Sequence, residues 1–319
     1  MVIQQCGRFA PTPSGRMHLG NLLSALIAWL SVRAAGGRIV LRMEDLDQKR
    51  CKEGYMRQME EDLLFLGLNW DEGGSLGGTH GPYEQHKRTR LYQAQLKKLE
   101  KQGLVYRCFC TRAELHAAEA PHVSDSETIY SGLCRVLSPD EIKERSQRRT
   151  PALRLLVPQE IISFTDGHYG LVCQNLAEEC GDFIIRRSDG VFAYQLAVVA
   201  DDAEMGITQV VRGRDLLSST PRQLYLYRLL GLEPPQFYHV PLLLSSDGRR
   251  LSKRERDLSL DQLTKRGFTS QELIGRLAFL AGLLDRPEPA APNELIELFT
   301  WDKVPVKDII LPPRLFESQ

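Results

Sequence analysis

The first third of the chain alternates between strand-like and helix-like apolar spacing, and this order limits the fold more than any other feature. A short apolar segment ends at residues 7–10, and helical spacing follows over residues 19–35, where a glycine pair ends it. A second strand is predicted at 38–43 and a second amphipathic helix at 55–66. Because strand–helix–strand order requires crossover connections, the sequence predicts an α/β fold on a Rossmann-type parallel sheet.

The rest of the chain carries the same two kinds of spacing. Further helices are predicted at 86–102, from Ser138 onward, at 221–230 and over 258–299. Further strands are predicted at 152–157, 183–187, 191–199, 207–212 and 237–244. The turn sequence at 188–190 (Ser-Asp-Gly) predicts that the strands at 183–187 and 191–199 form a hairpin.

The predicted elements divide the chain into four parts. Cysteines cluster between residues 108 and 134 in a stretch of poor periodicity, which indicates an insertion into the parallel-sheet domain. The four expected parts are the first half of that domain at 1–103, the insertion at 104–190, the second half at 191–256 and a short C-terminal helical segment at 257–319.

Charge and cysteine content indicate the class of protein and its compartment. The chain has 319 residues with 41 basic and 41 acidic side chains, and this zero net charge argues against binding nucleic acid through a global positive charge. Local basic clusters remain at 143–149 and 249–256. Seven cysteines, an odd number at low density, do not suit a disulfide scaffold. Without a signal peptide or an apolar run of roughly 18 residues, the chain is expected in the cytoplasm and not in a membrane.

Two segments are candidates for binding phosphate. Residues 11–21 join the first strand to the first helix, where free backbone N–H groups can face an anion, and His18 can donate a hydrogen bond. Residues 247–254 are strongly basic, and Lys253 has the compact charge that suits a polyanion. Taken singly, the first segment is equally consistent with a helix cap and the second with a solvated loop.

Together, the two segments resemble the sequence hallmarks of class I aminoacyl-tRNA synthetases. Residues 18–21 (His-Leu-Gly-Asn) resemble the histidine motif, with Asn in place of its final His. Residues 250–254 (Arg-Leu-Ser-Lys-Arg) resemble the lysine motif, with Leu for Met and Arg for the last Ser. The resemblance implies catalysis by His18 and Lys253. It also implies that ATP, with Mg²⁺ on its phosphates, is bound by His18, Gly20, Asn21 and Lys253.

Three more segments resemble the glutamyl/glutaminyl branch of this class, at residues 8–15, 42–47 and 201–215. Glutamate has two carboxylates and one ammonium, so its site needs an arginine fork, a carboxylate and further donors. The resemblance implies that Arg8 and Arg212 bind the carboxylates, without fixing which binds which. It further implies that Glu44 binds the amino group and that Tyr194 orients the substrate, all from predicted strand ends. The implied glutamate-binding set is completed by Phe9, Ala10, Pro11 and Thr12.

Length separates the members of this branch. Glutamyl-tRNA synthetases carry a substantial anticodon-binding domain after the lysine motif, whereas this sequence ends at residue 319, soon after Arg254. The chain is therefore more similar to the glutamyl-queuosine tRNA(Asp) synthetases, a family made of the catalytic core alone. The resemblance implies ATP-dependent activation of L-glutamate to glutamyl-adenylate without tRNA, followed by transfer to queuosine in the anticodon of tRNA(Asp). A monomer is expected.

The cysteine cluster suits a metal site. Cys108, Cys110 and Cys134 offer three thiolates for tetrahedral zinc, although buried free thiols would show the same pattern. Spacing leaves the fourth ligand open among four residues: His116, His122, Cys173 and Cys180. The family resemblance instead implies Tyr130 as the fourth ligand of one structural Zn²⁺ per chain, held in an acceptor-like insertion.

Three other functions stay open at this stage. A conventional glutamyl-tRNA synthetase would charge the 3′ end of tRNA. A non-catalytic RNA-binding module could descend from a synthetase, but the presence of His18, Lys253 and Glu44 argues against it. A different nucleotidyl transferase with the same histidine motif would not need a glutamate pocket.

Overall fold

The predicted parallel sheet forms the centre of the molecule. The structure is a computed structural model that describes residues 4–111, 129–245, 248–249 and 258–317. Five strands run parallel in two hydrogen-bonded groups, β1 (Cys6–Phe9), β2 (Arg38–Leu41) and β3 (Glu72–Gly73) in one, and β9 (Gln209–Gly213) and β10 (Gln236–Val240) in the other. β1 lies beside β9, where the Thr208 amide donates to the Cys6 carbonyl at 2.9 Å. The topology therefore brings the two halves of the predicted domain together.

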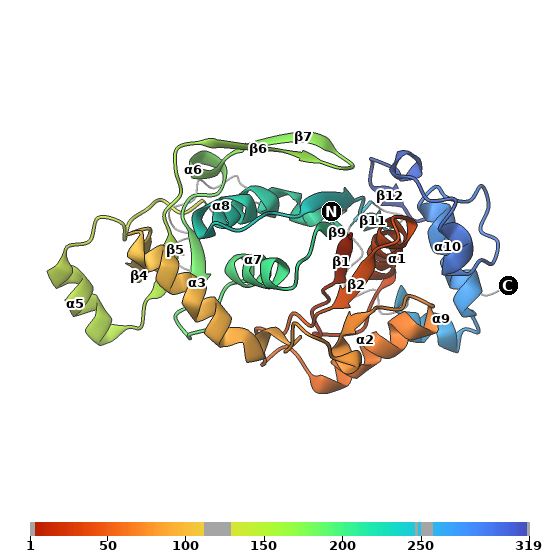
Figure 1. The fold of residues 1–319 in the computed structure, drawn as a ribbon, viewed down its shortest axis with the longest axis horizontal. Helices are drawn as coiled ribbons and strands as arrows, with labels where there is room; N and C mark the ends of the chain where they lie inside the picture. The colour runs from red at the N-terminus through yellow and green to blue at the C-terminus, as the bar shows by residue number, and fades with distance from the viewer. Residues whose placement is uncertain (1–3, 112–128, 246–247, 250–257, 318–319) are drawn as a thin grey trace.

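Helices cover both faces of these strands (Figure 1). Along β2, Ile39 and Leu41 join one hydrophobic cluster while Val40 joins the other, as expected for a strand that is buried on both faces. One cluster is built on α1 (Leu19–Ala34), α2 (Glu53–Phe65) and α10 (Ser270–Leu280). The other is built on α3 (Thr89–Lys101), α7 (Tyr194–Glu204) and α8 (Thr220–Leu230).

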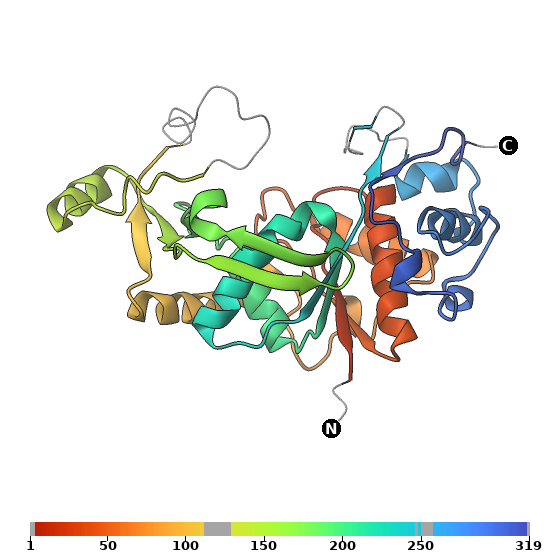
Figure 2. The same ribbon diagram turned by 90° about the horizontal axis from the view of Figure 1, so that it is seen from above.

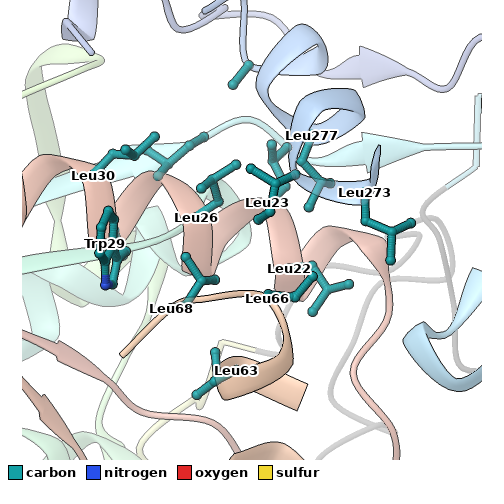
Figure 3. Close-up of a cluster of buried hydrophobic side chains, with 14 of the residues drawn as sticks. Leu22, Leu23, Leu26, Trp29, Leu30, Leu63, Leu66, Leu68, Leu273 and Leu277 are labelled. Carbon is teal, nitrogen blue, oxygen red and sulfur yellow. The ribbon is translucent and has the colours of Figure 1, made fainter. Parts of the chain in front are cut away.

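The first helix, α1, is buried along most of its length. Its single charged residue is Arg33, near its C-terminal end, so it has no polar face for solvent. Figure 3 shows its apolar side chains packed with those of its neighbours, namely Leu22, Leu23, Leu26, Trp29, Leu30, Leu63, Leu66, Leu68, Leu273 and Leu277. Each such side chain contributes about 1.5–3 kcal/mol when fully buried. The packing fixes the N-terminal end of α1, which faces the site described below.

An antiparallel part leaves the central layer after α3. Its strands are β4 (Val105–Cys108), β5 (Ala152–Leu155) and β8 (Phe183–Arg186), with a hairpin of β6 (Ile161–Asp166) and β7 (Gly170–Asn175) and helices α5 (Pro139–Arg148) and α6 (Leu176–Glu179). The predicted helix start at Ser138 is confirmed, since its backbone N–H donates to Glu141 at 2.8 Å. Figures 1 and 2 place β4 and α5 at one end of the molecule and α10 at the other.

The helices and strands predicted in the first third are confirmed, but two later predictions are wrong. Residues 191–199 are not a strand of a hairpin. A bridge between Arg186 and Phe192 forms, and the chain then enters α7 at Tyr194. An apolar helix buried on most sides lacks a polar face, so its sequence has the continuous apolar character of a buried strand. The β6–β7 hairpin is a feature that the sequence did not predict.

The predicted helix over 258–299 is the second error. The chain forms α9 (Leu260–Lys265) and α10, and between Leu280 and residue 299 the described chain continues in turns and the short 3-10 helix η5 (Pro292–Leu295). Three prolines between residues 287 and 292 remove backbone donors and end helical structure. The remaining short elements are β11 (Leu243–Leu244), β12 (Ile309–Ile310), η1 (Gly74–Leu76), η2 (Gln85–Arg88), η3 (Arg214–Ser219) and η6 (Trp301–Lys303). No helix in the described ranges combines the length and the apolar character needed to cross a bilayer.

Candidate active site and metal centre

A cavity of about 280 Å³ opens at the carboxyl ends of β1 and β9, beside the N-terminal end of α1. Ten residues predicted from the sequence line it: Arg8, Phe9, Ala10, Pro11, His18, Gly20, Asn21, Glu44, Tyr194 and Arg212. Thr12 is exposed and is not part of the lining. Lys253 lies outside the described residues. The structure therefore brings residues from four separate stretches of sequence into one site.

The histidine segment forms the start of α1. His18 is the residue just before the helix, and its backbone N–H donates to the Asn21 side chain at 3.3 Å. Gly20 lies against the imidazole, because a Cβ at this position would be 3.3 Å from the His18 ring. The first turn of the helix lines the cavity through His18, Gly20 and Asn21, so the positive end of the helix dipole lies where an anion would bind.

Arg212 is a buried guanidinium with neutral partners. Its Nε donates to His239 Nε2 at 3.0 Å, and its Nη2 donates to Thr220 Oγ1 at 2.8 Å. Its other contacts are the Leu216 carbonyl at 3.3 Å and the Tyr194 hydroxyl at 3.4 Å. Among the described residues, no carboxylate forms an ion pair with it. Burial lowers the pKa of Arg212, but an arginine remains charged in any folded protein.

Arg8 and Glu44 both lie next to the buried ion pair that a second arginine, Arg42, forms with Asp202. Arg42 is fully buried and donates to Asp202 at 2.6 Å and to Glu44 at 3.2 Å. Arg8 donates to the Val211 carbonyl at 3.1 Å, and its Nε lies 3.8 Å from the same Asp202 carboxylate. Burial raises the pKa of Glu44, and the positive charges of Arg42 and Arg8 oppose that shift.

Charged side chains of both signs line the cavity. Its lining includes two arginines, Arg8 and Arg212, and two carboxylates, Glu44 and the exposed Asp215. Asp201 is satisfied by Arg88 at 2.6 Å, with further hydrogen bonds from Gln85 and Tyr92. Because Arg212 has no carboxylate partner among the described residues and an uncompensated buried charge is costly, the site favours a ligand that brings a carboxylate to this arginine. The Glu44 carboxylate in the same cavity can receive an ammonium group.

The three predicted cysteines meet in a separate cluster. The sulfur atoms of Cys108, Cys110 and Cys134 lie within 4.8 Å of one another. The Tyr130 hydroxyl oxygen lies 3.6 Å from Cys108 Sγ and 3.7 Å from Cys110 Sγ, so it converges on the same point. Arg154 donates from Nε to Cys108 Sγ at 3.3 Å, and its guanidinium carbon lies 3.8 Å from the Tyr130 ring centroid. Three thiols and one phenol suit the four positions of a tetrahedral ion.

The other candidates for the fourth metal ligand have different positions. Cys173 is exposed on β7 and bonds to Ser163, and neither it nor Cys180 belongs to the cluster. His116 and His122 lie outside the described residues.

Residues that no sequence motif predicts also contact the site. His239 on β10 is the register partner of Arg212 on β9. The signal for it is a histidine within the predicted strand 237–244, since a buried imidazole there needs hydrogen-bond partners. Asp166, which bonds to His239, is in the hairpin that the sequence did not predict.

Comparison with known proteins supports this interpretation of the cavity. Residues 6–303 match the model of the family described as tRNA synthetases class I (E and Q), catalytic domain. The chain belongs to this family. The class and branch predicted from the sequence motifs are therefore confirmed, and so is the α/β catalytic-domain fold with a parallel sheet.

Several relatives in this family match the chain closely. It is 49% identical to the Glutamyl-Q tRNA(Asp) synthetase of Symbiobacterium thermophilum, over 96% of each chain. It is 47% identical to that of Nitratidesulfovibrio vulgaris, over 98% of this chain and 97% of the relative. The predicted resemblance to glutamyl-queuosine synthetases is thus confirmed. A Glutamate--tRNA ligase from Sulfurihydrogenibium sp. is 38% identical, and the match covers 97% of this chain and 64% of the ligase.

A solved structure has the same fold. The crystal structure of a glutamate tRNA ligase from Elizabethkingia meningosepticum in complex with its amino acid superposes with a TM-score of 0.84 at 27% identity. The superposition covers 98% of this chain and 68% of that one.

The buried Arg42 gives a prediction about stability. Replacing Arg42 with Met leaves the Asp202 carboxylate buried without its main partner, which typically costs about 3–5 kcal/mol. The matched control is Arg57→Met, since Arg57 forms an exposed pair with Glu53 that is worth less than about 1 kcal/mol. Urea unfolding of both variants measures the two free energies. Equal losses of stability would contradict the role given to the buried pair.

Proposed function

We propose that the chain uses ATP to activate L-glutamate to glutamyl-adenylate and transfers the glutamate to queuosine in tRNA(Asp). The observation that carries this proposal is the buried Arg212, which has only neutral partners among the described residues and shares the cavity with Arg8 and Glu44. An amino acid with two carboxylates and one ammonium complements those charges. The acceptor is inferred from the relatives that match along nearly their whole length.

Each predicted residue has a role in the first half-reaction. Arg8 and Arg212 would bind the two carboxylates of glutamate, and Glu44 would accept hydrogen bonds from its ammonium group. The bound ammonium adds a positive charge beside Glu44, which favours the ionised carboxylate against the effect of burial. Tyr194 would orient the substrate, and the backbone at 9–11 would line its path.

The second group of residues would bind ATP. His18, Gly20 and Asn21 form the N-terminal turn of α1, where phosphate oxygens find N–H donors and the positive end of the helix dipole. Lys253 is proposed to add a positive charge there.

The proposed chemistry is an in-line displacement followed by acyl transfer. An oxygen of the glutamate α-carboxylate attacks the α-phosphorus of ATP, the bond to the bridging oxygen breaks, and pyrophosphate leaves. A hydroxyl of queuosine then attacks the acyl carbon of the mixed anhydride, loses its proton and releases AMP. Neither step needs a covalent bond to the protein, so the contribution of the protein is position and charge stabilisation. Mg²⁺ would accompany the phosphates of ATP.

We propose that the cysteine cluster holds one structural zinc ion through Cys108, Cys110, Tyr130 and Cys134. Four protein ligands leave no open coordination position, so the ion would stabilise the fold and take no part in the reaction. These residues and Phe109 form a small core of their own, apart from the two large hydrophobic clusters. So small an apolar core supplies little stability, which is where a bound metal contributes most.

The four-part division of the chain remains a proposal. Residues 1–103 and 191–256 would form the catalytic domain, 104–190 the zinc-binding, acceptor-like insertion that meets tRNA, and 257–319 the C-terminal helical segment.

A conventional glutamate–tRNA ligase is the alternative function. Against it, identity to such a ligase is 38%, compared with 49% to a Glutamyl-Q tRNA(Asp) synthetase. A non-catalytic module is disfavoured because ten predicted substrate-binding residues line one cavity.

Transfer of labelled glutamate identifies the acceptor. The enzyme, ATP and radiolabelled glutamate are incubated with queuosine-containing tRNA(Asp), with the same tRNA lacking queuosine, and with tRNA(Glu). Label is expected only on the first, because only that tRNA carries the proposed acceptor. Labelling of tRNA(Glu), or equal labelling of both tRNA(Asp) samples, would show that the 3′ end is the acceptor and would reject the proposal.

Metal content tests the zinc site. In Cys110→Ser the bound zinc is expected to fall from about one ion per chain to a small fraction, since one of four ligands is weakened. The control Cys173→Ser changes an exposed thiol outside the cluster and is expected to keep the ion. Mass spectrometry of the metal after dialysis measures both. Full zinc in Cys110→Ser, or no zinc in the unmodified protein purified with zinc present, would contradict the assignment.

A further inference from the structure

A buried chain of polar groups stands behind Arg212. His239 is completely buried on β10, and its Nε2 receives the hydrogen bond from Arg212 Nε at 3.0 Å. On the other side of the ring, His239 Nδ1 lies 2.6 Å from Oδ2 of Asp166, which is 1% exposed at the end of β6. The three residues come from three strands and form one line from the β6–β7 turn to the cavity.

The hydrogen-bond chemistry of this line fixes every proton in it. A guanidinium can only donate, so His239 Nε2 must carry a lone pair and accept. The proton of the neutral imidazole is then on Nδ1, which donates to Asp166. The other oxygen of Asp166 accepts the two backbone N–H groups of His168 at 3.0 Å and Tyr169 at 2.9 Å, and at 3.3 Å that of His239, so this carboxylate is an acceptor on both sides.

The ionisation of both groups agrees with this assignment. Burial lowers the pKa of His239, which keeps the imidazole neutral. Hydrogen bonds from His239 and from the backbone hold the pKa of Asp166 below its usual range, although burial acts in the opposite direction.

We infer that Asp166 and His239 are positioning residues, which fix the Arg212 guanidinium at the cavity while leaving its positive charge free for a substrate carboxylate. The inference rests on the proposed role of Arg212 in binding glutamate. The other buried arginines show the contrast. Arg42 and Arg88 are held directly by the carboxylates of Asp202 and Asp201, at 2.6 Å in each case, and these contacts neutralise their charges. A neutral imidazole orients Arg212 without neutralising it.

The β6–β7 hairpin contributes to the active site through Asp166. The turn after Asp166 is attached to β10, because the Gly167 N–H donates to the Phe237 carbonyl at 2.8 Å. Phe164 and Phe237 add an edge-to-face contact with ring centroids 6.3 Å apart. The hairpin thus holds the carboxylate that sets the tautomer of His239.

Asp166→Asn tests the positioning role. The amide oxygen is expected to keep the two backbone N–H groups, which places the amide nitrogen against His239 Nδ1 and moves the imidazole proton to Nε2. That proton would face the Nε–H of Arg212 and displace the guanidinium. We expect the KM for glutamate in ATP–pyrophosphate exchange to rise about 10-fold or more, with the KM for ATP changed less than about twofold.

Two further variants make the result decisive. The matched control is Glu72→Gln, which alters another carboxylate–histidine pair, with His80 at 2.6 Å, away from the cavity. It is expected to leave the glutamate KM unchanged. Arg212→Gln is expected to raise the glutamate KM at least as much as Asp166→Asn. If Arg212→Gln has no effect, the proposed function of Arg212 fails. If Arg212→Gln raises the KM but folded Asp166→Asn does not, only the positioning role fails.

A spectroscopic measurement on the unmodified protein does not depend on the folding of Asp166→Asn. Nitrogen-15 NMR of histidine-labelled protein distinguishes the tautomers, and His239→Gln identifies the resonance. Near pH 7, His239 is expected to be neutral with the proton on Nδ1. A proton on Nε2, or on both nitrogens, would overturn the inference.

Discussion

The buried pair of Arg42 and Asp202 is the interaction on which the site depends. It joins the residue after β2 to α7 at 2.6 Å, and both Arg8 and Glu44 are supported by it. Removing two charges from water costs several kcal/mol for each ion, and this pair recovers that cost only through close contact and further hydrogen bonds. The apolar layers on both faces of the strands exclude water from it. The packing of the apolar core therefore also determines where the buried charged groups lie.

The same low-polarity surroundings give the arginines two different functions. Arg42 and Arg88 meet carboxylates and stabilise the fold. Arg212 meets only neutral acceptors among the described residues, so its charge is available to a ligand. In water a guanidinium would discriminate weakly between a carboxylate and an amide. In a buried cavity the discrimination is stronger, because charges interact more strongly where water is excluded.

Local patterns predicted much of this structure, and long-range contacts explain what they missed. The strand, loop and helix around His18 follow one another in sequence, so their spacing predicts them. Tyr194 was placed at the site by resemblance, although it begins a helix where a strand was predicted, because a buried apolar helix lacks the usual periodicity. Asp166 and His239 are 73 residues apart, and no spacing rule joins them. Tyr130 converges with the three cysteine sulfurs through folding of the insertion, which the cysteine spacing alone does not indicate.

The central claim is that the cavity arginines, of which Arg212 has no carboxylate partner among the described residues, select an amino acid with an anionic side chain. The side chains of glutamate and glutamine have nearly the same size, but the first ends in a carboxylate and the second in an amide. Their kcat/KM values in ATP–pyrophosphate exchange, measured with the same enzyme preparation, test the claim most directly. A fully desolvated charge pair is worth about 2–5 kcal/mol, so glutamate should be favoured by at least about 30-fold. Values for glutamine within a few-fold of those for glutamate would contradict the account.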